Sequence, residues 1–193
     1  MTRPAKYTKS QLAKRLETVF KENGYEGASM KMLSEATGLS KASLYHHFPK
    51  GKDEMAAYVL AQSGARLQTL VLSPLAQEAP KSGVQKLLAS FQGTANYYDG
   101  APPFCLMNSL LLGSGLDLFS SRIGAAVEMW RKGLSSCLVE AGASRQDAND
   151  WADDVLGRIQ GALVLCRVSG QRLPLETCLR GLEEDVETWG AAS

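Results

Sequence analysis

The sequence predicts an all-α protein of about nine helices, with a three-helix helix-turn-helix domain over residues 1–52 and a larger helical domain over 53–193. Apolar residues recur at spacings of three and four rather than two. Residues rich in Gly, Pro and Ser separate these periodic segments. Charge also divides the chain: residues 1–52 carry ten Lys and Arg against four Asp and Glu, a net charge of +6, whereas the remainder has a net charge of −5. This asymmetry indicates that the first segment meets a polyanion, although uneven placement of solvated charges is the alternative.

Three short helices are expected near the N-terminus. The first covers residues 9–23 and has one apolar stripe, which is typical of a helix packed on a core. The second covers "MKMLSEAT" and the third covers "KASLYHHF". Ser residues are preferred caps at helix starts, and Gly and Pro end helices. The three helices should therefore begin or end at Gly24, Ser29, Gly38, Ser40, Pro49 and Gly51.

The rest of the chain reads as helices joined by short breaks. A long helix is expected over residues 53–72, with two acids at its positive end, and a linker over 73–83. Further helices are expected at about 82–98, 104–112, 118–141, 145–168 and 175–189. They form the second predicted domain.

The third helix has the composition of a DNA-recognition helix. A helix of about two turns is not stable alone in water, so neighbouring elements must hold it. Leu39, Leu44 and Phe48 have the spacing to pack inward, and the second helix of a helix-turn-helix enters the major groove. The predicted DNA-binding residues are Ser40, Lys41, Ala42, Ser43, Tyr45, His46, His47 and Lys52. Two alternatives remain: the rings pack against the following long helix, or the motif binds protein.

A family resemblance covers the same segment. From Lys9 to Met55 the chain resembles the TetR family of bacterial transcriptional regulators, through "VFKENGYEGASMKMLSEATGLSKASLYHHF". The turn "FPKGKDEM" is one residue longer than in many members and is similar to that of the LmrA and YxaF type of multidrug-resistance repressors. The resemblance implies DNA contacts from Lys41, Ala42, Ser43, Tyr45, His47 and Lys52, and it implies a ligand-binding and dimerisation role for the second domain.

The last two helices are the candidates for dimerisation. Apolar residues of the final helix step by four, three, four and three, which favours packing against another helix, either of a partner or of the same chain. Two glycines of the preceding helix allow close approach, and two such helices from each copy can form a four-helix bundle. The dimerisation candidates are Gly157, Gly161, Leu175, Leu179, Leu182, Val186 and Trp189.

A ligand cavity is expected near the helix breaks of the second domain. Small-molecule pockets are mostly apolar with a few polar anchors. The candidates are Phe91, Tyr97, Tyr98, Phe104, Cys105, Asn108, Leu111, Val127, Trp130 and Gln160, of which the Asn and Gln would be the anchors. Ordinary core packing is the alternative for each of them.

The pattern as a whole predicts a homodimeric repressor that binds a palindromic DNA operator and is released by a small, largely apolar effector. Four widely spaced cysteines without a CxxC motif, and no long apolar run, favour a reduced, cytoplasmic protein that is not in the membrane. No cofactor or metal is expected. The alternatives are a redox-sensing regulator using Cys105 and a helical protein-binding adaptor. An enzyme is disfavoured, because both histidines lie in the predicted DNA-binding helix.

Overall fold

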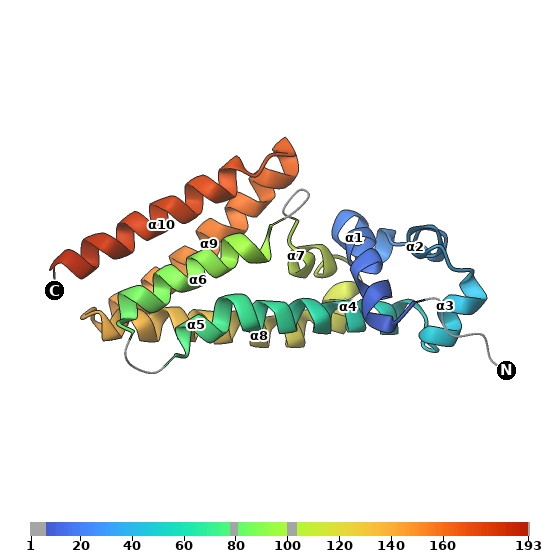
Figure 1. The fold of residues 1–193 in the computed structure, drawn as a ribbon, viewed down its shortest axis with the longest axis horizontal. Helices are drawn as coiled ribbons and strands as arrows, with labels where there is room; N and C mark the ends of the chain where they lie inside the picture. The colour runs from blue at the N-terminus through green and yellow to red at the C-terminus, as the bar shows by residue number, and fades with distance from the viewer. Residues whose placement is uncertain (1–6, 78–80, 100–103, 193) are drawn as a thin grey trace. The chain divides into compact units, whose positions relative to one another are not determined.

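The computed structural model describes residues 7–77, 81–99 and 104–192, and every regular element in these ranges is a helix (Figure 1). The elements are α1 (Lys9–Gly27), α2 (Met30–Thr37), α3 (Lys41–His47), α4 (Lys52–Leu67), the π-helical turn η1 (Gln68–Leu72), α5 (Ser73–Leu75), α6 (Gly83–Tyr97), α7 (Leu106–Leu110), α8 (Gly115–Glu140), α9 (Arg145–Ser169) and α10 (Leu173–Ala192). Since α4, η1 and α5 are continuous, the described residues form nine helical segments. The predicted all-α fold is confirmed.

The chain folds into two compact units. Unit 1 comprises Met1–Gly64 and Cys105–Ile123, and unit 2 comprises Ala65–Phe104 and Gly124–Ser193. Unit 1 therefore extends beyond the predicted domain boundary at residue 52 and takes in α7 and the first residues of α8. The functional boundary at residue 52 stays a prediction.

The core of unit 1 joins α1 to the next three helices. Leu16 and Phe20 of α1, Leu33 of α2, Leu44 of α3 and Met55 of α4 are all fully buried. Burial of one such side chain stabilises the fold by roughly 1.5–3 kcal/mol. This shared core is what holds helices that are too short to be stable alone.

The last turns of α1 contact α7. The Ser109 hydroxyl of α7 donates to the carbonyl oxygen of Lys21 at 2.8 Å. At Gly24 the backbone has a φ of +68°, and a Cβ there would lie 2.9 Å from the Ser109 carbonyl oxygen. The predicted break at Gly24 is confirmed, because its backbone is not helical and kinks the chain where α7 approaches, but helical residues resume after it and α1 ends at Gly27 rather than at Asn23.

Unit 2 is built around α6 and the α9–α10 hairpin. The Ser90 hydroxyl of α6 donates to the Val71 carbonyl oxygen of η1 at 2.9 Å, and Arg158 of α9 is bonded to Asp185 of α10 at 2.6 Å. The helical run preceding α6 extends to Leu75, three residues into the predicted linker, and includes Pro74 in α5. Residues 78–80 of that linker lie outside the described ranges.

The predicted dimer seam of the last helix requires a correction. Leu175, Leu179, Leu182 and Val186 are at most 5% exposed, and α10 packs on α9 and α6 of its own unit. These four side chains are therefore already buried, and the prediction that they contact a second copy does not hold. Figure 1 shows α9 and α10 running side by side.

No helix in the described part of the chain is long and apolar enough to cross a lipid bilayer.

Candidate nucleic-acid interface

The helix α3 is capped at its start and anchored on one side. The Ser40 side chain accepts a hydrogen bond from the Ser43 backbone N–H at 3.1 Å, which satisfies a donor at the helix start, as predicted. Leu44 and Phe48 are fully buried. Seven helical residues are thus fixed by one cap and by two apolar anchors, and the opposite side is left open.

The turn between α2 and α3 is also fixed. Gly38 ends α2 in the left-handed conformation, as predicted, and the Ser34 hydroxyl donates to the Leu39 carbonyl oxygen across the turn. The Arg15 guanidinium of α1 donates to the Thr37 carbonyl oxygen at 3.2 Å. These bonds set the angle between the two helices of the motif.

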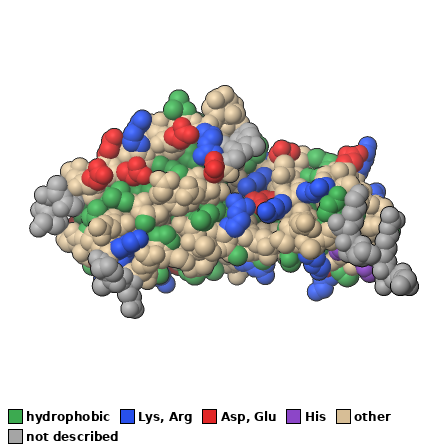
Figure 2. Space-filling model, viewed as in Figure 1, with side chains coloured by type: hydrophobic (Ala, Val, Ile, Leu, Met, Phe, Trp, Pro, Cys, Tyr) green, Lys and Arg blue, Asp and Glu red, His purple; other side chains and the backbone are tan. Residues whose placement is uncertain are grey.

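The open side of α3 presents polar and aromatic groups. Lys41, Ala42, Tyr45 and His46 are exposed, and Tyr45 has 47% of its surface accessible. Ser40 is exposed at the cap, whereas Ser43 and His47 are half-buried. Histidine side chains reach the surface at the α3 end of unit 1 (Figure 2). The structure therefore brings seven of the eight predicted DNA-binding residues onto one short helix and its cap.

The ring of Tyr45 packs against the following turn. Gly51 has a φ of +67°, and a Cβ at this position would lie 3.0 Å from Tyr45 Cε1. The Gly51 backbone N–H donates to the Phe48 carbonyl oxygen at 2.8 Å and closes the turn. One edge of the Tyr45 ring is thereby supported while much of the side chain stays open to solvent.

Lys52, the eighth predicted residue, lies in a different setting. Its ammonium donates to the Tyr25 carbonyl oxygen at 3.0 Å and sits 4.3 Å from the centre of the Tyr25 ring. The Tyr25 hydroxyl donates to the Asp53 carboxylate. Burial, followed by this hydrogen bond, raises the pKa of Tyr25 to about 12. Lys52 thus links the end of α1 to the start of α4.

Lys50 was missed in the sequence, although it stands in the same lengthened turn. Lys50 is exposed, and its backbone N–H donates to Glu54 at 3.0 Å. That bond is the main reason why the pKa of Glu54 lies below its usual value, and an ion pair with Lys9 at 3.1 Å adds to it. The lengthened turn "FPKGKDEM" is the signal for Lys50 in the sequence, because it contains a second lysine two residues before Lys52.

The predicted ligand residues are divided between the two units. Phe91, Tyr97, Tyr98, Phe104, Val127, Trp130 and Gln160 belong to unit 2, whereas Cys105, Asn108 and Leu111 belong to unit 1. A ligand-binding role for either group stays a prediction. In the first group Val127 is exposed, and Phe91, Tyr97, Tyr98 and Trp130 are buried.

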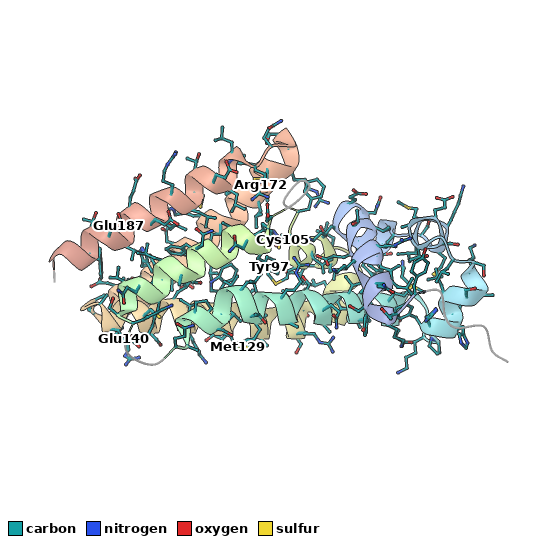
Figure 3. All side chains as sticks on the ribbon, viewed as in Figure 1. Tyr97, Cys105, Met129, Glu140, Arg172 and Glu187 are labelled. Carbon is teal, nitrogen blue, oxygen red and sulfur yellow. The ribbon has the colours of Figure 1, made fainter. Side chains whose placement is uncertain are left out.

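Unit 2 contains two close pairs of aromatic rings. The rings of Tyr97 and Tyr98 meet edge to face at 4.8 Å, and Phe91 lies 6.3 Å from Trp151, which the sequence reading did not include. Arg172 donates to the Tyr98 carbonyl oxygen at 2.8 Å; Figure 3 labels Arg172 and Tyr97. The indole N–H of Trp130 is buried and has no acceptor among the described residues. Such a donor is available to an oxygen of a bound molecule.

A groove of about 340 Å³ lies elsewhere on unit 2. Its lining comes from the π-helical turn, α5 and α8, and comprises Gln68, Leu72, Leu75, Ala76, Met129, Lys132, Gly133 and Ser136; Met129 is labelled in Figure 3. It contains none of the predicted ligand residues. Within the described residues, no three His, Cys, Asp or Glu side chains are grouped to hold a metal ion.

Both parts of the chain match known families. Residues 13–59 match the bacterial regulatory proteins of the tetR family, and residues 80–180 match the C-terminal domain of LmrA/YxaF-like transcriptional regulators. The transcriptional repressor DhaR of Mycobacterium sp. (strain GP1) is 27% identical over 168 residues, which is 83% of each chain. The regulator YxaF of Bacillus subtilis (strain 168) is 24% identical over 162 residues, 81% of this chain and 83% of YxaF.

Solved structures share the fold. A TetR transcriptional regulator from Legionella pneumophila has a TM-score of 0.76 at 19% identity, covering 95% of this chain and 99% of that one. A TetR regulator from Chloroflexus aurantiacus J-10-FL has a TM-score of 0.75 at 21% identity, covering 93% of both chains. The matched families and curated relatives are transcriptional regulators rather than enzymes. With its capped helix-turn-helix in unit 1 and a matching C-terminal domain, the chain belongs to the TetR family of transcriptional regulators, with a C-terminal domain of the LmrA/YxaF-like type.

Proposed function

We propose that this regulator is a repressor that binds a palindromic operator as a homodimer and is released by a small, largely apolar effector. The observation that carries the proposal is the open side of α3, where a capped and anchored helix exposes Lys41, Tyr45 and His46. Because α3 is already folded and anchored, it loses little conformational entropy when it binds DNA. Less of the free energy of its contacts is therefore offset by the cost of ordering the helix.

The proposed contacts follow from the chemistry of the side chains. Lys41 reaches a phosphate or a guanine edge, and Ala42 permits close approach or contact with a thymine methyl group. Tyr45 and His46 donate to phosphate oxygens. Ser43 and His47 are half-buried, so we expect them to contribute less to operator binding than the exposed residues of α3.

The dimer is proposed to form through α9. Gly157 and Gly161 are exposed on this helix, with Val164, Leu165 and Val168, which are 54%, 58% and 81% exposed. These positions share one side of a helix with 3.6 residues per turn. A contiguous apolar face of this kind is typical of a protein interface. A two-fold dimer would place two α3 helices for successive half-sites, roughly 34–36 Å or a multiple apart.

The effector is proposed to bind in the aromatic part of unit 2. Phe91 and Trp130 supply apolar surface, and the Trp130 N–H supplies one unsatisfied donor. An apolar molecule with one oxygen acceptor matches these features. Binding that favours the form with wrongly spaced α3 helices, by about 1–3 kcal/mol, would weaken operator binding roughly 5- to 150-fold.

Cys105 offers less support for redox sensing. Its side chain is only 5% exposed. Oxidation of a sensor thiol requires access to the oxidant.

The cytoplasmic location that the sequence predicts is part of the same proposal, since an operator-binding protein works where the DNA is.

The test is selection of genomic fragments by purified protein, followed by fluorescence anisotropy of the selected duplex over a salt series. We expect sequence-selective binding that falls steeply with salt, since each phosphate contact releases counterions. A Tyr45→Ala, Lys41→Ala variant should retain its helical circular dichroism and lose most of the affinity. Selective binding to no fragment by folded protein would reject the proposal and favour the adaptor alternative.

A further inference from the structure

We propose that Lys50, rather than Lys52, supplies the phosphate-binding cation beside α3, and that Lys52 is a positioning residue that joins α1 to α4. The inference rests on the proposed function, namely that α3 binds DNA. It assigns different tasks to two lysines that stand two residues apart in the same turn.

Lys52 is half-buried and is bonded within unit 1. Its ammonium is bonded to the Tyr25 carbonyl oxygen at 3.0 Å and rests on the Tyr25 ring at 4.3 Å. Tyr25 itself is only 7% exposed and donates its hydroxyl to Asp53, the next residue after Lys52. Together, Tyr25, Lys52 and Asp53 form a closed joint between the end of α1 and the start of α4. Moving Lys52 to a phosphate would open that joint.

Lys50 is less constrained than Lys52. Its side chain is exposed, and among the described residues its ammonium makes no hydrogen bond or close ion pair, although its charge helps to lower the pKa of Glu54. Its backbone is nevertheless fixed, because its N–H donates to Glu54 at 3.0 Å and the next residue, Gly51, donates to Phe48 at 2.8 Å. A free cation on a fixed backbone is suited to contact a phosphate.

The turn between α3 and α4 places Lys50 next to α3. Gly51 approaches the Tyr45 ring so closely that a Cβ would lie 3.0 Å from Tyr45 Cε1. Lys50 directly precedes Gly51, and both Lys50 and Tyr45 are exposed. Because Lys50 adjoins the residue that contacts the Tyr45 ring, the proposal places one phosphate group within reach of both the Tyr45 hydroxyl and the Lys50 ammonium.

The nearby acids are already occupied, so they oppose a phosphate only weakly. Glu54 accepts from the Lys50 backbone N–H and pairs with the Lys9 ammonium at 3.1 Å. Asp53 accepts from the Tyr25 hydroxyl. The start of α4 therefore presents Lys50 to solvent while both of its carboxylates are bonded within unit 1.

The test uses Lys50→Met and Lys52→Met in the full-length protein, because Met keeps most of the apolar stem and removes the charge. The selected operator duplex is titrated by anisotropy over a salt series, and thermal unfolding is followed by circular dichroism. A phosphate contact contributes about −0.9 to the slope of log Kobs against log salt, so one contact per subunit contributes about −1.8 in a dimer.

Lys50→Met is expected to make the slope less negative by about 1.8 and to leave Tm unchanged. Lys52→Met is expected to leave the slope unchanged and to lower Tm by roughly 2–4 °C, with a similar loss of affinity at every salt concentration. Lys132→Met on α8, whose side chain is 70% exposed in unit 2, is the control and should change neither quantity.

Two results would overturn the assignment: an unchanged slope in Lys50→Met, or a less negative slope in Lys52→Met. If Lys52→Met does not fold, the Lys50→Met slope still decides the phosphate contact, and the uncharged variant Lys52→Gln with reduced Tm but unchanged slope supports positioning. If wild-type protein binds no duplex selectively, the proposed function fails, while the Tm difference between the two Met variants still tests the joint.

Discussion

Replacing Val164 by Glu should break the proposed homodimer. Val164 lies between Gly161 and Val168 on the exposed face of α9, so a two-fold interface formed by this face would bury it from both copies. A carboxylate in that position would replace an apolar contact by a charge, and it would do so twice in each dimer.

The magnitude follows from the exposure of the side chain. Full burial of a Val side chain is worth roughly 1.5–3 kcal/mol, and Val164 is 54% exposed in the single chain. Burial of that remainder in both copies contributes about 1.6–3.2 kcal/mol, which corresponds to roughly 15- to 200-fold in the dimer Kd. Desolvating two carboxylates adds several kcal/mol more, about a further 100-fold or beyond.

The assay is sedimentation velocity of wild type and variant over a dilution series from micromolar to nanomolar protein. The matched control is Leu118→Glu, because Leu118 is 50% exposed and lies on α8, outside the α9 face. We expect the control to sediment as wild type and Val164→Glu to sediment as a folded monomer with unchanged circular dichroism. A wild-type monomer throughout, or a Val164→Glu dimer as tight as wild type, would refute the assignment of this face.

Two further predictions concern the contacts between α1 and the segment that includes α7. Ser109→Ala removes the bond to the Lys21 carbonyl oxygen, worth about 1 kcal/mol, and should speed amide hydrogen exchange in the last turns of α1 roughly fivefold; equal exchange rates in both proteins would show that the bond does not hold α1. Glu26 accepts from the Ser114 hydroxyl and backbone N–H, and the hydroxyl is the main cause of its lowered pKa. The folded state is therefore stabilised by this carboxylate above the usual pKa of 4.5 and loses that contribution as pH falls through the lowered value. Chemical unfolding should show wild type more stable than Glu26→Gln at neutral pH, with the difference shrinking below pH 4.5; a difference that grows in acid would contradict it.

The local elements could be predicted because their signals are local. Ser29, Gly38 and Ser40 act within three residues of their own positions, and the structure shows each cap where the sequence placed it. The apolar anchors Leu44 and Phe48 follow from helical spacing alone. The same holds for the bounds of α6 and α9, which lie within one residue of those predicted.

Contacts across the fold could not be predicted in the same way. The spacing of Leu175, Leu179 and Leu182 indicates one apolar face, but a spacing cannot tell whether a partner or the same chain covers it. In the structure α9 and α6 cover it, and the exposed face is on α9 instead. Lys52 shows the same limit, because its partner Tyr25 is 27 residues away in the sequence.

If an effector binds unit 2 as proposed, the order of the chain would give the response a physical route. Residues 105–123 belong to unit 1, although the chain on both sides of them, 65–104 and 124–193, belongs to unit 2. Any effector-induced displacement at either end of this segment must be absorbed inside it or passed on to α1 through the Ser109–Lys21 and Glu26–Ser114 bonds. A positive-φ Gly24 at the same contact leaves no room for a side chain, so α7 and α1 meet backbone to backbone. Because backbone contacts transmit displacement with little slack, we expect these bonds to affect release from the operator more than operator affinity itself.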